Sequence, residues 1–166
     1  MSTVRVLVVR LDQTNHGSLG FSVSHDHGII RIVRITALGP ADLDGRLKIG
    51  DHVLSVNGQT LDGVSLGPVV QMLRQPASAT LAVQRRVRRV VLCRPAAGGS
   101  YGVVLRTGRR QTLVIQQIVS GSVAAGSCLK KGDCLESING LCCVRMTCAV
   151  ARTAARGTQQ LVLLVA

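Results

Sequence analysis

Three groups of side chains in this sequence have the right types to do chemistry: a His-Asp-His run, six cysteines and a short loop around a glycine. His25, Asp26 and His27 are consecutive, so in a strand they would point to alternate faces, and we expect the segment to form a loop without a metal site. The sequence has no H-E-x-x-H helix, no phosphate loop and no Cys/His pair with an orienting acid. We therefore expect a protein that is not an enzyme and needs no cofactor.

The cysteines show no C-x-x-C pair and no spacing typical of zinc ligands. Disulfides would require an oxidising compartment, which nothing else in the sequence indicates. We expect reduced, mostly buried thiols that pack as small apolar groups. The residues are Cys93, Cys128, Cys134, Cys142, Cys143 and Cys148.

The net charge of +12 is concentrated in one part of the chain. Residues 1–84 carry seven basic and six acidic residues, whereas residues 85–110 carry eight arginines and no acid. Nucleic-acid binding usually adds aromatic side chains that stack on bases, and this chain offers only Phe21 and Tyr101. We therefore do not expect a nucleic-acid partner.

Nearly half of the residues are apolar, which is enough to build a core. No apolar run is as long as the roughly 18 residues that cross a bilayer, and the first residues lack the pattern of a signal peptide. These features predict a cytoplasmic protein.

An internal repeat divides the chain. Residues 45–58 align with residues 127–140 at an offset of 82, and seven of the fourteen positions are identical. The same offset aligns Gly39 with Gly121, and Ser18-Leu19-Gly20-Phe21 with Ser100-Tyr101-Gly102-Val103. We expect two domains, 1–85 and 86–166, that meet near residues 84–87.

The elements that position these residues follow from periodicity and turn signals. In the first copy, strands are predicted at 4–11, 21–24, 29–35, 52–56 and 80–83, with glycines between them. A short helix is predicted at 40–44, beginning at a proline, and a longer helix at 66–74 after Ser65. Its counterpart in the second copy is predicted at 148–156, with Thr147 as its cap.

These motifs, in this order and spacing, resemble the PDZ family. The resemblance rests on residues 18–21, Gly39-Pro40-Ala41, residues 47–51 and Val56-Asn57-Gly58, and it recurs in the second copy. It implies a mainly β fold with some helix, in which a small, partly open β-barrel is capped by two helices, here in two tandem copies. The layout is similar to the close tandems of syntenin-like or Mint-like adaptors.

The resemblance implies an adaptor that binds the C-terminal tails of membrane receptors or other proteins by adding the tail as a strand. Backbone N–H groups of Leu19, Gly20 and Phe21 would hold the tail's carboxylate. The implied peptide-binding residues of the first copy are Leu19, Gly20, Phe21, Ser22, Val23, Ser24, Leu66, Val70 and Leu73. The family's selector histidine is replaced by Leu66, which predicts hydrophobic-x-hydrophobic tails, because a tail hydroxyl there would be left without a partner.

The second copy departs more from the family pattern. Its matching residues are Tyr101, Gly102, Val103, Val104, Leu105, Cys148, Arg152 and Ala155. Arg152 would lie in or across the groove, where it would either favour acidic tails or obstruct binding, and the two alternatives stay open.

The arginines near the join have two interpretations. A solvated basic face is the simpler one, and attraction to anionic lipid head groups at the inner membrane surface is the alternative. The lipid-binding candidates are Arg85, Arg86, Arg88, Arg89, Arg109 and Arg110. Self-association into a homodimer through exposed strand edges also stays open.

Overall fold

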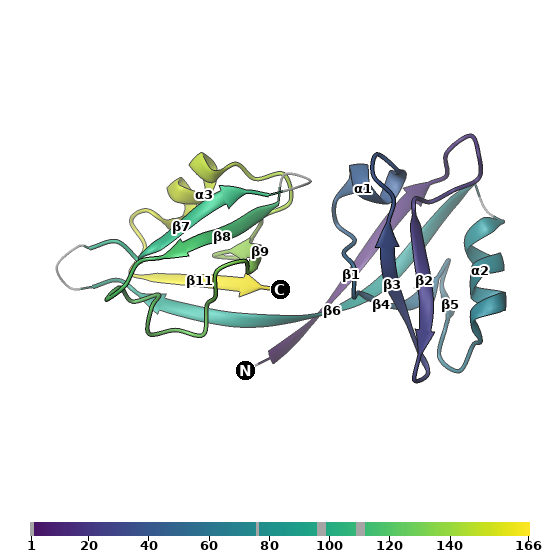
Figure 1. Ribbon diagram of the computed structural model, residues 1–166, viewed down its shortest axis with the longest axis horizontal. Helices are drawn as coiled ribbons and strands as arrows, with labels where there is room; N and C mark the ends of the chain where they lie inside the picture. The colour runs from purple at the N-terminus through teal and green to yellow at the C-terminus, as the bar shows by residue number, and fades with distance from the viewer. Residues whose placement is uncertain (1, 76, 96–98, 109–111) are drawn as a thin grey trace. The chain divides into compact units, whose positions relative to one another are not determined.

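The computed structural model describes residues 2–75, 77–95, 99–108 and 112–166 (Figure 1). The chain separates into two compact units. Residues 4–85 form one, called the first unit below, and residues 86–166, grouped with the start of the chain, form the other, called the second unit. Each unit contains its own cluster of buried apolar side chains.

The first unit is built from antiparallel strands and two helices. The elements are β1 (Ser2–Asp12), β2 (Phe21–Asp26), β3 (Ile29–Ile35), α1 (Pro40–Asp44), β4 (His52–Val56), β5 (Gln59–Thr60), α2 (Leu66–Arg74) and the beginning of β6 (Ser78–Cys93). The hydrogen-bonded order is β2-β3-β4-β6, with β1 added to β6 and β5 added to β4. The order is an open path that ends at β2, so the sheet is not closed.

Local sequence explains both helices of this unit. Pro40 occupies the first turn of α1, where its missing N–H is harmless, and Gly45 ends the helix in the left-handed region at φ 78°. Ser65 precedes α2 in extended conformation, although its side chain makes no capping hydrogen bond. Val69 is the fully buried residue of α2 and packs into the core of the unit.

The second unit repeats most of these elements. They are the later part of β6, β7 (Val103–Thr107), β8 (Leu113–Ile118), β9 (Cys134–Ile138), β10 (Leu141–Cys142), α3 (Cys148–Ala155) and β11 (Gln160–Val165). The order is β6-β11-β9-β8-β7, with β10 added to β9, so β7 ends the path as β2 does in the first unit. Thr147 caps α3 by accepting a hydrogen bond from the N–H of Val150 at 3.3 Å.

The short helix expected in both copies forms only in the first unit, and residues 120–128 of the second unit make turns and bends instead. The N–H of Ala41 bonds to the carbonyl of Leu19, and that of Ala124 bonds to the carbonyl of Tyr101, each at 3.1 Å. The local offset is therefore 83, which aligns Gly39 with Ser122 and not with Gly121. It also places Gly126, a poor helix former, where the first unit has Leu43.

Strand β6 is longer than the sequence indicated. A strand at 80–83 followed by a join was expected, whereas β6 runs without interruption from Ser78 to Cys93. Its first part pairs with β4 and its last part with β11. The buried positions are odd-numbered up to Val87 and even-numbered from Val90 onward, so the alternation changes phase at this point. Among the described residues, no helix has the length and apolar character needed to cross a membrane.

Candidate functional site

A groove in the first unit is lined by residues of edge strand β2, helix α2 and the loop before β2. Figure 1 shows β2 and α2 next to each other in this unit. We call this groove the first groove. It encloses about 710 Å³ and is lined by His16, Gly17, Ser18, Leu19, Phe21, Ser22, Val23, Val70, Leu73 and Arg74. Six residues implied by the family resemblance are therefore brought together there, whereas Gly20, Ser24 and Leu66 lie outside the lining.

Strand β2 offers one free edge to this groove. In the described sheet β2 pairs with β3 alone, with Phe21 opposite Ile35 and Val23 opposite Ile32. Backbone N–H and C=O groups on an unpaired edge are ready to bond another extended chain. Because side chains alternate along a strand, an added segment would present every second residue to α2.

The loop before β2 is shaped by a close contact between two backbone segments. Gly20 has φ 79°, and a Cβ at this position would lie 3.0 Å from both the Cα of Gly39 and the backbone N of Pro40. The N–H of Gly20 donates to the hydroxyl of Ser18 at 3.1 Å. A ligand carboxylate that used the N–H of Gly20, as the resemblance implies, would have to displace the Ser18 hydroxyl.

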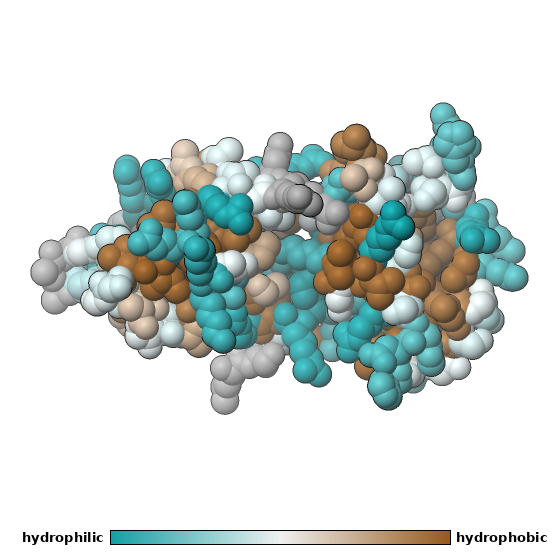
Figure 2. All heavy atoms as spheres, viewed as in Figure 1, coloured by the Kyte–Doolittle hydropathy of each residue, from teal (hydrophilic) through white to brown (hydrophobic). Residues whose placement is uncertain are grey.

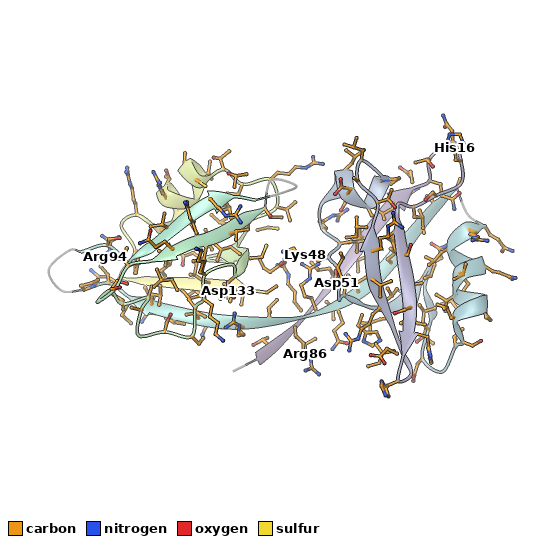
Figure 3. The ribbon with its side chains drawn as sticks, viewed as in Figure 1. His16, Lys48, Asp51, Arg86, Arg94 and Asp133 are labelled. Atoms are coloured by element: carbon orange, nitrogen blue, oxygen red, sulfur yellow. The ribbon has the colours of Figure 1, made fainter. Side chains whose placement is uncertain are left out.

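The groove has a basic end. His16 is exposed on the loop (Figure 3) and Arg74 is exposed in the last turn of α2, and both line the groove. Arg74 was not singled out from the sequence, because the loop before β2 is distant from it in the chain; the structure brings them together, with the Gln13 side chain donating to the carbonyl of Arg74 at 3.1 Å. Leu66, at the first position of α2, is half-buried and packs against the core.

A second groove lies between β7 and α3 in the second unit. It encloses about 410 Å³ and is lined by Arg94, Gly99, Ser100, Tyr101, Val103, Leu105, Leu135, Ile138, Ala151, Arg152, Ala155, Arg156, Leu161 and Leu163. Five expected residues meet there: Tyr101, Val103, Leu105, Arg152 and Ala155. Gly102, Val104 and Cys148 lie outside the lining.

Tyr101 and Arg94 form one wall of the second groove. The Tyr101 hydroxyl donates to the carbonyl of Thr158 at 2.6 Å, and the same carbonyl accepts from Nε of Arg94 at 3.0 Å. The Arg94 guanidinium also lies 5.3 Å from the centre of the Tyr101 ring, within the range of a cation–π contact. Sequence reasoning missed Arg94, because nothing local links it to a loop 64 residues later.

The arginines near the join do not all belong to a solvated basic face, which was the simpler of the two interpretations. Arg85 is 6% exposed and ion-paired with Asp51, and Arg88 is half-buried and bonds to Asp133 at 2.7 Å. These two guanidinium groups are already bonded to carboxylates within their units, which argues against their role as lipid ligands. Arg86 and Arg89 are exposed, and Arg86 points away from β6 in Figure 3. Arg109 and Arg110 lie outside the described residues.

The His-Asp-His run and the cysteines, which were the other candidates for chemistry, do not come together in a site among the described residues. Within the described parts of the chain, no three His, Cys, Asp or Glu side chains come together to hold a metal ion. His27 Nδ1 contacts the Asp26 carboxylate at 2.5 Å. The expectation of mostly buried thiols is wrong: all six cysteines are free, but only Cys143 is buried, because the others lie at strand ends, in turns and at the start of α3.

Residues 63–67, Gly-Val-Ser-Leu-Gly, match the G-x-S-x-G spacing of a nucleophile elbow, a match that sequence reasoning overlooked. Ser65 has ordinary extended dihedrals, φ −71° and ψ 161°, and simply precedes α2. An elbow requires a strained turn directly between a strand and a helix, which this segment does not make.

The two grooves share an architecture: an open edge strand, a helix beside it and a glycine loop at one end. This defines the first unit as a small β domain with an unpaired edge available for ligand. Residues 8–84 match the family model of the PDZ domain, and the first unit is accordingly a PDZ domain. PDZ domains bind the C-terminal motifs of other proteins and are generally not catalytic.

Several known proteins are similar over part of the chain. The human synaptojanin-2-binding protein is 45% identical over 67 residues, which cover 40% of this chain and 46% of that protein. The glutamate receptor-interacting protein 1 of Rattus norvegicus is 34% identical over 118 residues, covering 61% of this chain and 11% of that protein. The chain thus spans less than half the length of these relatives.

Among solved structures, the second PDZ domain of Dlg1 from the choanoflagellate Monosiga brevicollis is 33% identical, with a TM-score of 0.45. The match covers 48% of this chain and 97% of that one.

Proposed function

We propose that this protein is a non-catalytic adaptor that captures C-terminal tails of partner proteins by strand addition to β2. The observation that carries the proposal is the free edge of β2 beside an apolar groove with a basic end, formed by His16 and Arg74. The edge supplies main-chain hydrogen bonds, and the basic end favours a terminal carboxylate.

The lining predicts the preferred tail. Phe21, Val23, Val70 and Leu73 are apolar, which favours an aliphatic last residue. Leu66 stands at the first position of α2, where it offers no hydrogen bond to a hydroxyl two residues before the tail's end. The first groove therefore prefers hydrophobic-x-hydrophobic tails.

Peptide binding measured by fluorescence anisotropy tests this function. A tail ending Val-x-Val should bind more tightly than one ending Thr-x-Val, and amidation of the terminal carboxylate should abolish both. Equal binding of free and amidated tails would contradict the carboxylate-dependent mechanism, and a preference for the threonine tail would contradict the role of Leu66.

We also propose that the second unit is a PDZ-like copy of the first. Equivalent contacts support this: the N–H of Lys48 bonds to Asp51 and that of Lys130 to Asp133, each at 2.9 Å. The Asn57 side chain accepts from the N–H of Thr80, and Asn139 from the N–H of Val162, each at 2.8 Å. These pairs recur at the offset of 82.

A second candidate function is attraction to an anionic membrane surface on the cytoplasmic side. Residues 86–166 contain only two acidic residues, and neither is exposed: Glu136 is 5% exposed and the Asp133 side chain is 12% exposed. Exposed Arg86 and Arg89 therefore face solvent in a unit whose exposed charges are all cationic. Each basic residue near such a surface contributes about 1 kcal/mol.

Sedimentation with vesicles of neutral or phosphatidylserine-containing lipid tests the membrane proposal. The double variant R86S/R89S should lower partitioning to the acidic vesicles about thirtyfold. R34S, which removes an exposed arginine of β3, is the matched control. Binding that is the same for neutral vesicles, or unchanged in R86S/R89S, would rule out this surface.

A further inference from the structure

The second groove is lined by core side chains of the central strands of its unit, whereas in the first groove Leu19 is the one buried core side chain in the lining. Its floor consists of side chains from β9 and β11 that are at most 4% exposed: Leu135, Ile138, Leu161 and Leu163. Their counterparts at the offset of 82 are Val53, Val56, Ala79 and Leu81, and none of these lines the first groove. The second groove is the smaller in volume, and we call it the deeper of the two only because these core side chains form its floor.

Three positions around this floor carry smaller side chains than in the first unit, although Tyr101 and Leu105 are larger than their counterparts Leu19 and Val23. On the strand side, Val103 stands where the first unit has Phe21. On the helix side, Ala151 and Ala155 stand where the first unit has Val69 and Leu73. The part of the groove beside these small side chains is bounded by the apolar floor, and covering apolar surface from water is favourable. A large apolar side chain from a ligand would occupy it favourably.

The rim of the second groove carries a positive charge at a helix position where the first groove is apolar. Arg152 lines it where Val70 lines the first, and Arg152 is exposed on α3. The acids of this unit are not available to it, because Asp133 is bonded to Arg88 and to the N–H of Lys130, and Glu136 is buried. Among the described residues Arg152 has no ion-pair partner. Figure 2 shows hydrophilic side chains lying over apolar ones on the visible face of this unit.

We propose that the second groove binds C-terminal tails with a large aromatic last residue and an Asp or Glu two positions before it. The inference rests on the proposed strand addition, here to the free edge of β7. In an added strand the last residue and the residue two before it point the same way, toward α3. The aromatic ring then enters the cavity beside Ala155, and the carboxylate faces Arg152.

Full-length chain and fluorescein-labelled nine-residue peptides test this specificity by anisotropy. The probes end in Asp-Ser-Phe, Ser-Ser-Phe, Lys-Ser-Phe and Val-Ser-Val, the last being the probe for the first groove. Ala155→Leu and Arg152→Val each restore the first-unit residue. Ala149→Leu adds the same bulk at an exposed position of α3 and is the matched control.

Ala155→Leu should weaken the Asp-Ser-Phe tail at least about tenfold by filling its pocket, while Val-Ser-Val binding and the Ala149→Leu control stay unchanged. Arg152→Val should bind the Asp-Ser-Phe and Ser-Ser-Phe tails with equal affinity. Arg152→Glu should transfer the preference to Lys-Ser-Phe, a gain that misfolding cannot produce.

Failure of this inference differs from failure of the proposed function. The inference is overturned if Asp-Ser-Phe does not bind the unaltered chain, or if Ala155→Leu leaves its affinity unchanged, even where Val-Ser-Val binds. If the unaltered chain binds Asp-Ser-Phe but not Val-Ser-Val, the function proposed for the first groove is contradicted. Asp-Ser-Phe binding that remains sensitive to residue 155 would then still support the second site.

Discussion

The guanidinium of Arg85 binds both carboxylate oxygens of Asp51, with Nε–Oδ1 at 2.6 Å and Nη2–Oδ2 at 2.5 Å. Arg85 also donates to the carbonyl of Arg46 at 2.7 Å. The second unit repeats the arrangement: Arg88 bonds to Asp133 and to the carbonyl of Cys128, each at 2.7 Å. The acceptors are equivalent in the repeat, since Asp133 follows Asp51 by 82 residues and Cys128 follows Arg46 by 82. The two arginines are not equivalent in the repeat, because both belong to β6 and lie three positions apart.

Removing Arg85 should destabilise the first unit strongly. R85M leaves the Asp51 carboxylate buried with its counter-charge gone, which typically costs about 3 kcal/mol or more. Hydrogen exchange of β4 amides should show this loss. R86M, at the adjacent exposed position, is the control and should change the free energy of unfolding by less than about 0.5 kcal/mol. Equal effects of the two variants would refute the buried-pair interpretation.

Gly20→Ala should disrupt the loop of the first groove. The alanine would be strained at φ 79° and would contact Gly39 and Pro40 at 3.0 Å, so we expect tail affinity to fall at least about tenfold. Gly28→Ala meets the same strain at φ 80° but no neighbouring atom within 4 Å. It should therefore leave tail affinity intact in an anisotropy titration, and similar losses in both would show that backbone strain alone is responsible.

Leu66→His should change tail selection. A histidine at the start of α2 offers a ring nitrogen to a hydroxyl two residues before the tail's end, and one hydrogen bond corresponds to about a tenfold gain for Thr-x-Val tails. Leu43→His, on the exposed surface of α1, is the control. Unchanged relative affinity for Val-x-Val and Thr-x-Val tails in L66H would show that this position does not read the tail.

His52 should make the stability of the first unit depend on pH. Partial burial, and secondarily the cation of Arg31 directly opposite it in β3, lowers the pKa of His52 below 6.5. The neutral ring is thus favoured in the folded state. Its stabilising contribution is complete above pH 6.5 and is lost as pH falls through the folded-state pKa.

The free energy of unfolding of the first unit, measured by β4 hydrogen exchange at a series of pH values, should therefore decrease below pH 6.5. H52Q should flatten this part of the curve, whereas H27Q, at an exposed position, should preserve it. If the pH dependence of the free energy of unfolding is the same in H52Q as in the unaltered chain, a group other than His52 is responsible for it.

Much of the fold was predictable because its signals are local. The bounds expected for β3, β4 and α2 are confirmed. Apolar residues and neighbouring glycines mark the two strands, and Ser65 marks the start of the helix. The prediction of a short helix in the second copy was wrong. It relied on the repeat, whereas Val123 and Gly126 do not favour a helix there.

The candidate sites were predictable only in part. Leu19, Phe21 and Val70 could be placed by their motif and helical spacing, and the structure brings them together. The burial of Arg85 could not be foreseen, because its partner Asp51 lies 34 residues earlier and an arginine-rich run normally faces solvent. The depth of the second groove likewise depends on β9 and β11, which no local motif connects to α3.

The continuity of β6 limits how this protein can be cut for study. Gln84 still pairs with His52, Arg85 still neutralises Asp51, and Arg88 already pairs with Val165. A gene fragment encoding one half must therefore end or begin at residues 86–87. A boundary placed a few codons to either side would strip a core strand residue or a buried counter-charge from one of the products, and that product could fail to fold for reasons unrelated to binding.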